Sequence, residues 1–310
     1  MARAERTRAQ GPLALAWQRF LLRRVSVVAL GALVLIALLA MAADVVAPYP
    51  PGEQHLDDIL VGPSADYWLG TDTLGRDTLS RVLHGGRVSL LVGVSVAVLA
   101  SVIGTLVGLV AGYRGGHVDA VLMRITDTLL ALPLLMVVIL LARILGGSVF
   151  DVVLVLSLFG WMPLARIIRA RALALREHEF VRAARAMGAG MSRIMFRHLL
   201  PNLVGEITVA VSLAVAGAIL AEAVLSFLGL GISQVHAATW GNMLGGNEGF
   251  MTTAPWLVWA PGLAIVVTVL SVNYVGDGLR DVFDVKTDVG DGAKSTHRGP
   301  TAPEAQDASA

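Results

Sequence analysis

Long apolar runs separated by polar segments constrain the fold of this chain more than any other feature. A helix needs roughly 20 apolar residues to cross the hydrocarbon core of a membrane. The six runs closest to this length are 25–47, 88–112, 125–145, 149–164, 203–230 and 255–275. The composition agrees, since only 15% of the 310 residues are charged, whereas soluble domains average about 25%. We therefore expect an all-α integral membrane protein with six transmembrane helices.

The first run has a second interpretation. Ala40-Met41-Ala42 resembles the small-x-small cleavage site of a secretory signal peptide, and basic residues precede the run. However, the run is longer than the ~7–15 apolar residues of a usual signal peptide. A transmembrane helix over 25–47 is favoured, and a signal peptide remains the alternative.

Basic residues predict the orientation of the spans. If the N-terminus is cytoplasmic, all of the 24 lysines and arginines except Arg76, Arg81, Arg87 and Arg143 fall on the inner side. Such an excess is typical of cytoplasmic segments. The expected layout is a cytoplasmic tail (1–24), a first transmembrane helix (25–47), an extracytoplasmic loop (48–86), a five-helix core (87–277) and a cytoplasmic, partly disordered tail (278–310). Both termini are then cytoplasmic in a multi-pass protein of the cell membrane.

Small residues recur at every fourth position of the second span. Gly104, Gly108 and Gly112 share one stripe. This spacing lets helix backbones approach closely in lipid. It predicts a helix-packing surface rather than a ligand site.

The segment between the fourth and fifth spans predicts two short helices broken at Gly188. Phe180, Ala183, Ala184 and Met187 lie at i, i+3, i+4 and i+7, which is one helix face. A second stripe comprises Met191, Ile194, Met195 and Leu199. Isolated helices below ~12–15 residues are marginal in water, so each must pack on something. Periodicity leaves anionic lipid headgroups and a groove on a partner protein equally open.

The same segment resembles the cytoplasmic "EAA" loop of bacterial ABC importer permeases. Ala183-Ala184, Gly188 and Leu200-Pro201 have the spacing of that motif, whereas Arg182 replaces its glutamate and His198 its isoleucine. Four further stretches between Asp66 and Asp284 resemble the C-type subunit of the dipeptide/oligopeptide/nickel branch. They are WLGTDTLGRDTLSRVLHGGRVSL, MRITDTLLALPLL, ILAEAVLSFLGLGI and NYVGDGLRDVFD.

The resemblance implies a type I ABC importer permease architecture with cytoplasmic coupling helices in the loop 177–201. In such a protein the two helices fit a groove on an ABC ATPase subunit, and Gly188 sets the angle between them. Phe180, Ala184 and Met187 would fill the groove. The coupling residues implied are Glu179, Phe180, Ala183, Ala184, Met187, Gly188, Leu200 and Pro201. A homologous second permease and an extracytoplasmic substrate-binding protein would complete the assembly. The implied substrate is a di- or oligopeptide, with nickel or another small solute as the alternative.

The chain shows no pattern for catalysis. It has no cysteine, and DVGDGAKST lacks the glycine that precedes lysine in a phosphate-binding loop. No H-E-x-x-H zinc motif occurs. We expect no catalytic residues, no metal, no cofactor and no nucleic-acid partner, so ATP hydrolysis would belong to other subunits.

Acidic residues in or near the spans are the remaining candidates, because charges are costly in a bilayer. Glu222 could line a passage, hold a subunit contact, or be a packed carboxylate hydrogen-bonded between helices. Asp127, three residues after Arg124, is expected to form an ion pair with it. In the loop, Asp72 and neighbouring charges would stabilise turns or receive a binding protein. An ion-coupled secondary transporter would need several charges at mid-membrane, whereas these carboxylates lie mostly near span ends. A membrane scaffold without transport would not need paired docking helices.

Overall fold

The protein is all-helical in its described parts. The computed structural model describes residue 18, residues 20–234 and residues 237–291. Within these ranges, the only strand-like pairing is a bridge between Thr71 and Asp77. The helices are α3 (Arg24–Met41), α4 (Ala43–Val46), α5 (Thr78–Arg114), α6 (Gly116–Leu130), α7 (Leu134–Leu145), α8 (Val149–Gly160), α9 (Met162–Leu175), α10 (Glu179–Ala186), α11 (Met191–Ile194), α12 (Val204–Phe227), α13 (Trp240–Leu244) and α14 (Trp256–Asp291). A π-helical turn (Met195–Leu199), a 3₁₀ turn (Leu200–Asn202) and a second 3₁₀ turn (Glu248–Phe250) complete the set.

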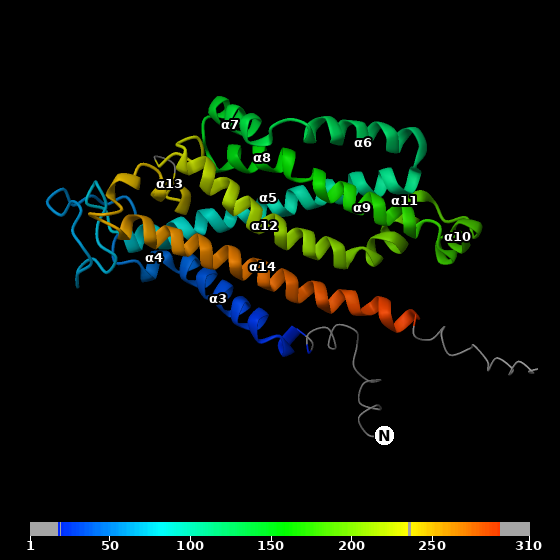
Figure 1. The fold of residues 1–310 in the computed structure, drawn as a ribbon, viewed down its shortest axis with the longest axis horizontal. Coiled ribbons are helices and arrows are strands. Elements are labelled where there is room, and N and C mark those ends of the chain that lie inside the picture. Colours follow the sequence, from blue (N-terminus) through cyan, green and yellow to red (C-terminus); the bar gives the residue numbers. More distant parts are fainter. Residues whose placement is uncertain (1–17, 19, 235–236, 292–310) are drawn as a thin grey trace, which may run out of the picture.

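The long helices form one elongated bundle (Figure 1). Helix α5 packs against α9 and α12, α12 also packs against α14, and α14 packs against α3. Residues 47–77 and α13 lie at one end of the bundle, which we call the loop end. Helices α10 and α11 lie at the opposite end, the short-helix end.

The glycine stripe of α5 lies where α9 approaches most closely. A Cβ atom added at Gly104 would lie 2.6 Å from the Trp161 carbonyl oxygen, and one at Gly108 would lie 2.6 Å from that of Ala165. Real side chains do not tolerate such distances, so only glycine permits this approach. The prediction of a helix-packing surface is confirmed, and the stripe allows α9 to pack closely on α5.

Five helical segments are long and apolar enough to cross a membrane, or six if the bent pair α6 and α7 counts as one span. The prediction of one continuous helix over 125–145 is wrong. Helices α6 and α7 meet at 84° across a break that contains Pro133. Proline lacks an N–H donor and disfavours helical geometry in the residue before it, which accounts for the break.

Several helices extend beyond the predicted apolar runs. Helix α5 begins at Thr78, ten residues before the predicted start at 88, because the Asp77 side chain caps it by accepting from the Ser80 N–H at 2.8 Å. The fourth span continues to Leu175 as α8 and α9. Helix α14 runs to Asp291, into residues that we predicted to be a polar tail. Apolar runs mark only the part of a helix that favours lipid, and an established helix propagates cheaply beyond it.

The first span is an integral part of the bundle. The Ser26 hydroxyl donates to the Tyr274 carbonyl of α14 at 3.0 Å. A Cβ atom added at Gly278 would lie 2.8 Å from the Phe20 ring. These contacts attach the first span and the residues before it to α14.

Candidate functional site

The hinge between α10 and α11 is built around Gly188, as predicted. Gly188 has φ +81°, a left-handed conformation that favours glycine. Its N–H donates to the Arg185 carbonyl, and the Ala189 N–H donates to the Ala184 carbonyl, both at 3.0 Å. These two bonds satisfy carbonyl groups at the end of α10 in a Schellman motif. The chain therefore changes direction here through a defined turn.

Helix α10 has one face toward the bundle and a second apolar face toward the outside. Val181 and Ala184 are buried. Phe180 is 40% exposed and Met187 80% exposed, and Ala183 is exposed as well. We call Phe180, Ala183 and Met187 the outer face of α10. Ala184, which was expected to fill a partner's groove, instead packs inside its own chain, because it lies on the same side of the helix as Val181.

The second short helix is fastened to the bundle along its predicted stripe. Ile194, Met195 and Leu199 are buried, and Met191 lies partly buried beside them. Their cluster includes Leu109 of α5, Ile168 of α9 and Leu203 before α12. The backbone passes from α11 through the π-helical and 3₁₀ turns directly into α12. Leu200 is partly buried, whereas Pro201 is exposed within the 3₁₀ turn.

Exposed arginines are frequent in α10, α11 and the turn that follows. Arg182, Arg185, Arg193 and Arg197 are exposed, and the Arg185 guanidinium lies 5.5 Å from the centre of the Tyr113 ring. Glu179, in the first turn of α10, is exposed, where a carboxylate complements the helix dipole. The surface thus combines an apolar centre with a polar rim, the usual anatomy of a protein-binding patch.

Three ion pairs hold α9 to its neighbours near this end. Arg166 pairs with Asp127, Arg169 with Asp119, and Arg171 with Glu206. The first pair corrects our expectation that Asp127 pairs with Arg124. The actual partner is 39 residues away in the sequence, and the folding of α6 along α9 brings the two together.

Glu222 lies inside the loop end and bonds to three helices. It is completely buried and accepts hydrogen bonds from Ser226 at 2.7 Å and from Ser89 at 3.4 Å. Thr239 also hydrogen-bonds to the carboxyl group. The geometry therefore matches the packed-carboxylate alternative, in which Glu222 joins α12 to α5 and to the cap of α13.

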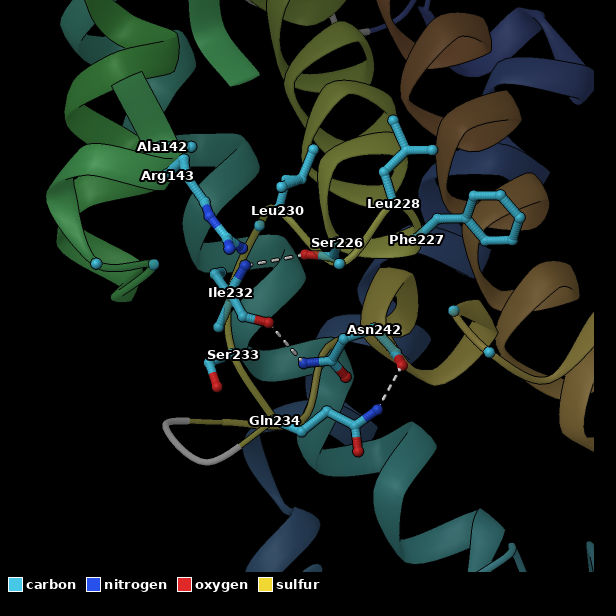
Figure 2. Close-up of a pocket in the computed structure, with 16 residues that line it drawn as sticks. Ala142, Arg143, Ser226, Phe227, Leu228, Leu230, Ile232, Ser233, Gln234 and Asn242 are labelled. Carbon is cyan, nitrogen blue, oxygen red and sulfur yellow. Dashed lines mark hydrogen bonds between the residues drawn. The ribbon is translucent and has the colours of Figure 1, made fainter. Parts of the chain in front are cut away.

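Sequence reasoning missed α13 and the cavity beside it. Thr239 and Asn242 form a reciprocal capping box at the start of α13. This capping pattern is short, and no apolar periodicity accompanies it in the sequence. Figure 2 shows the cavity, of about 600 Å³, between α7 and the α12–α13 connection. The Asn242 amide donates to the Ile232 carbonyl at 3.1 Å, and Gln234 donates to the Asn242 carbonyl at 2.9 Å. The Arg143 side chain points into this cavity.

Comparisons with known families agree with this architecture. Residues 104–289 match the family described as the binding-protein-dependent transport system inner membrane component. Residues 11–63 match the N-terminal transmembrane domain of oligopeptide transport permease C, so the similarity reaches farther toward the N-terminus than the motifs indicated.

Individual relatives cover most of the chain. A protein of Brucella suis biovar 1 that carries the name of a peptide permease is 42% identical over 281 residues, covering 90% of this chain and 93% of the relative. The oligopeptide transport system permease protein OppC of Bacillus subtilis is 40% identical, covering 86% and 88%. The dipeptide transport system permease protein DppC of the same organism is also 40% identical, covering 87% and 85%.

A solved structure supports the fold. An inward-facing structure of the MetNI methionine ABC transporter matches with a TM-score of 0.52 at 19% identity, covering 65% of this chain and 96% of the other. At this identity the likeness concerns the fold alone, which is that of type I importer permeases. Taken together, the helical bundle, the motif-bearing loop and the family matches show that this chain belongs to the ABC importer permeases of the dipeptide/oligopeptide/nickel branch, as a C-type subunit.

Proposed function

We propose that this chain is the membrane subunit that converts ATP-driven movement of partner ATPases into passage of di- or oligopeptides. The observation that carries the proposal is the double-sided α10. Its inner side is anchored through Val181, whereas its outer face leaves Phe180 and Met187 exposed. A helix that is anchored to the bundle on one side and presents a free apolar face on the other is suited to helix-in-groove binding.

The connection from α11 into α12 supplies the mechanical link. Helical turns run without interruption from Met191 to Phe227, apart from a single residue at Leu203, which is itself buried. A push on α10 and α11 would therefore tilt α12 along its length. Because α12 reaches the loop end, movement at one end would alter packing at the other, as in other shear transitions.

The placement of charge supports a cytoplasmic position for the short-helix end. The exposed arginines of α10 and α11 lie there, and an excess of basic residues is typical of the cytoplasmic segments of membrane proteins. The loop end would then be extracytoplasmic and face a substrate-binding protein. A homologous second permease would complete the passage. The peptide names of the relatives favour a peptide substrate over nickel.

A pair of substitutions that each introduce a negative charge tests the docking role of α10. Met187→Asp places a carboxylate in the centre of the outer face, and burying it against a partner would cost several kcal/mol. Ala186→Asp places the same charge on the neighbouring residue, which is exposed but lies off the outer face. We expect Met187→Asp to weaken ATPase binding at least about tenfold, since about 1.4 kcal/mol corresponds to tenfold. Ala186→Asp should change it much less.

Co-purification of the ATPase with each full-length variant, followed by titration in lipid nanodiscs, provides the measurement. Thermal unfolding of both variants should match the parent chain, since both sites are exposed. Equal ATPase binding by the two variants would contradict the proposed docking face.

A further inference from the structure

A smaller cavity of about 220 Å³ adjoins the large one at the loop end. Gln234, Gly245 and Gly246 line both cavities, so they form a shared wall. We call the smaller cavity the arginine pocket, after two of its lining side chains. The polar lining relevant to its chemistry comprises Asp72, Arg76, Thr78, Arg81, Gln234 and Asn247.

The arginine pocket holds two guanidinium groups and one shared carboxylate. Arg76 Nε lies 2.7 Å from Asp72 Oδ2, and Arg81 lies 3.3 Å from the same oxygen. Asp72 Oδ1 is already occupied by the N–H groups of Leu74 and Arg76. Arg81 is only 3% exposed. Asp77, the other nearby acid, does not line the pocket; its Oδ2 accepts from Ser80 at the start of α5, and its buried Oδ1 has no partner among the described residues. Among the described residues, Arg81 therefore shares with Arg76 the one carboxylate with which it forms an ion pair.

A buried hydroxyl in the same pocket lacks a partner. Thr78 is 1% exposed and lines the cavity. Among the described residues, no group accepts from or donates to its Oγ1 atom. Buried polar groups are nearly always hydrogen-bonded, and leaving one unsatisfied is costly. A guanidinium that shares its carboxylate, in the same pocket as an unpartnered hydroxyl, points to an acceptor that enters from outside the chain.

We propose that the arginine pocket binds the terminal carboxylate of a peptide, with the remainder of the peptide in the larger cavity. The inference rests on the proposed function and deepens it by naming the substrate group that this subunit recognises. Guanidinium groups match carboxylates in charge and geometry, and charge-assisted hydrogen bonds are about twice as strong as neutral ones. The small pocket has room for a carboxylate, and the adjoining 600 Å³ cavity has room for the residues that precede it.

The test compares alanyl-alanine, alanyl-alanine amide and acetate as probes. Binding is measured by isothermal titration calorimetry on the assembled transporter in lipid nanodiscs, without nucleotide and without binding protein. The amide keeps the peptide's size but removes its terminal charge, whereas acetate keeps only the charge. We expect alanyl-alanine to bind at least about tenfold more tightly than either, as expected when a charged hydrogen-bonded partner is lost.

Variants at Thr78 separate recognition from folding. Thr78→Val has nearly the same shape, and because Oγ1 has no partner in the described chain, thermal stability should not fall. Its affinity for alanyl-alanine should fall about five- to tenfold, since the hydrogen bond to a charged group is lost. Thr78→Ser retains the hydroxyl and should restore most of the affinity. Arg81→Lys should weaken binding by about tenfold or more, since lysine lacks the planar fork.

The possible outcomes are distinct. Tighter binding of the free acid, lost in Thr78→Val and restored in Thr78→Ser, supports the proposal. The proposal is overturned if alanyl-alanine shows no detectable binding, or if its amide or acetate binds as tightly as alanyl-alanine. Unchanged affinity for alanyl-alanine in Thr78→Val also overturns it. If ATP-driven peptide uptake persists in any of these cases, only this inference fails. If the unaltered transporter shows no ATP-driven peptide uptake, the proposed function fails.

Discussion

The two ends of the bundle are held together by different kinds of contact. At the loop end, buried polar contacts such as those of Ser89 with Glu222 and with the Trp240 N–H join segments that are distant in the sequence. At the short-helix end, aliphatic side chains around Ile194 and Leu199 hold α11 against α5 and α9, with ion pairs outside. Hydrogen bonds are directional and costly to leave unmade, whereas apolar contacts are not directional. The loop end is therefore suited to holding one geometry, and the short-helix end is suited to movement.

The largest expected effect concerns the polar contacts of the loop end. Glu222→Leu removes an acceptor from the hydroxyls of Ser89 and Ser226 in the interior. We expect the free energy of unfolding to fall by about 2–4 kcal/mol, the cost of several unsatisfied buried groups. Glu222→Gln keeps an acceptor oxygen and should lose less than half as much. Thermal unfolding in detergent micelles measures both, and an unchanged midpoint for Glu222→Leu would refute the role of Glu222 as a polar clamp.

The next effect concerns the hinge at the other end. Gly188→Val forces a β-branched residue to φ +81°, which costs about 1–3 kcal/mol. Gly190→Val is a matched control, because Gly190 has φ −69° and open space around its Cβ position. We expect the first variant to lower the amount of peptide taken up per ATP hydrolysed, and the second to leave it near the parent value. Parent-like uptake by Gly188→Val would show that the hinge geometry is not needed for coupling.

The smallest effect is a local one in the loop 47–77. The pKa of Tyr67 is raised to about 12, mainly by burial and next by the 2.9 Å hydrogen bond that its hydroxyl donates to Asp58. Because this pKa is higher in the folded loop than the ordinary value of 10.0, its stabilising contribution is complete below pH 10. That contribution is lost as the pH rises from about 10 to about 12. Phenolate absorbance should show one tyrosine titrating late, and Tyr67→Phe should remove that phase. A normal titration of all tyrosines would contradict the buried Tyr67–Asp58 contact.

Sequence reasoning predicted what depends on local pattern. The apolar runs located the long helices, Gly188 located the hinge, and the stripe from Met191 to Leu199 identified a buried surface, because each follows from helical periodicity. The inner side of α10 was less clear, since Val181 and the outer-face residues are all apolar and only tertiary packing decides which is buried.

Features that depend on long-range contacts were not predictable in this way. The local pattern pairs Asp127 with its neighbour Arg124, although its partner Arg166 lies on another helix. The break at Pro133 is not evident from hydropathy because the surrounding run is uniformly apolar. Helix α13 has five residues and depends on capping and on hydrogen bonds from Trp240 to Ser89 and Val82. No short-range sequence pattern predicts these long-range bonds.

The central claim is that this subunit receives its driving force from partner ATPases and supplies none itself. The most direct measurement is peptide uptake into proteoliposomes that contain this chain and its partner permease, with and without the ATPase subunits. The account predicts accumulation only when the ATPases, ATP and the binding protein are all present. Accumulation by the membrane subunits alone, driven by an ion gradient, would contradict it.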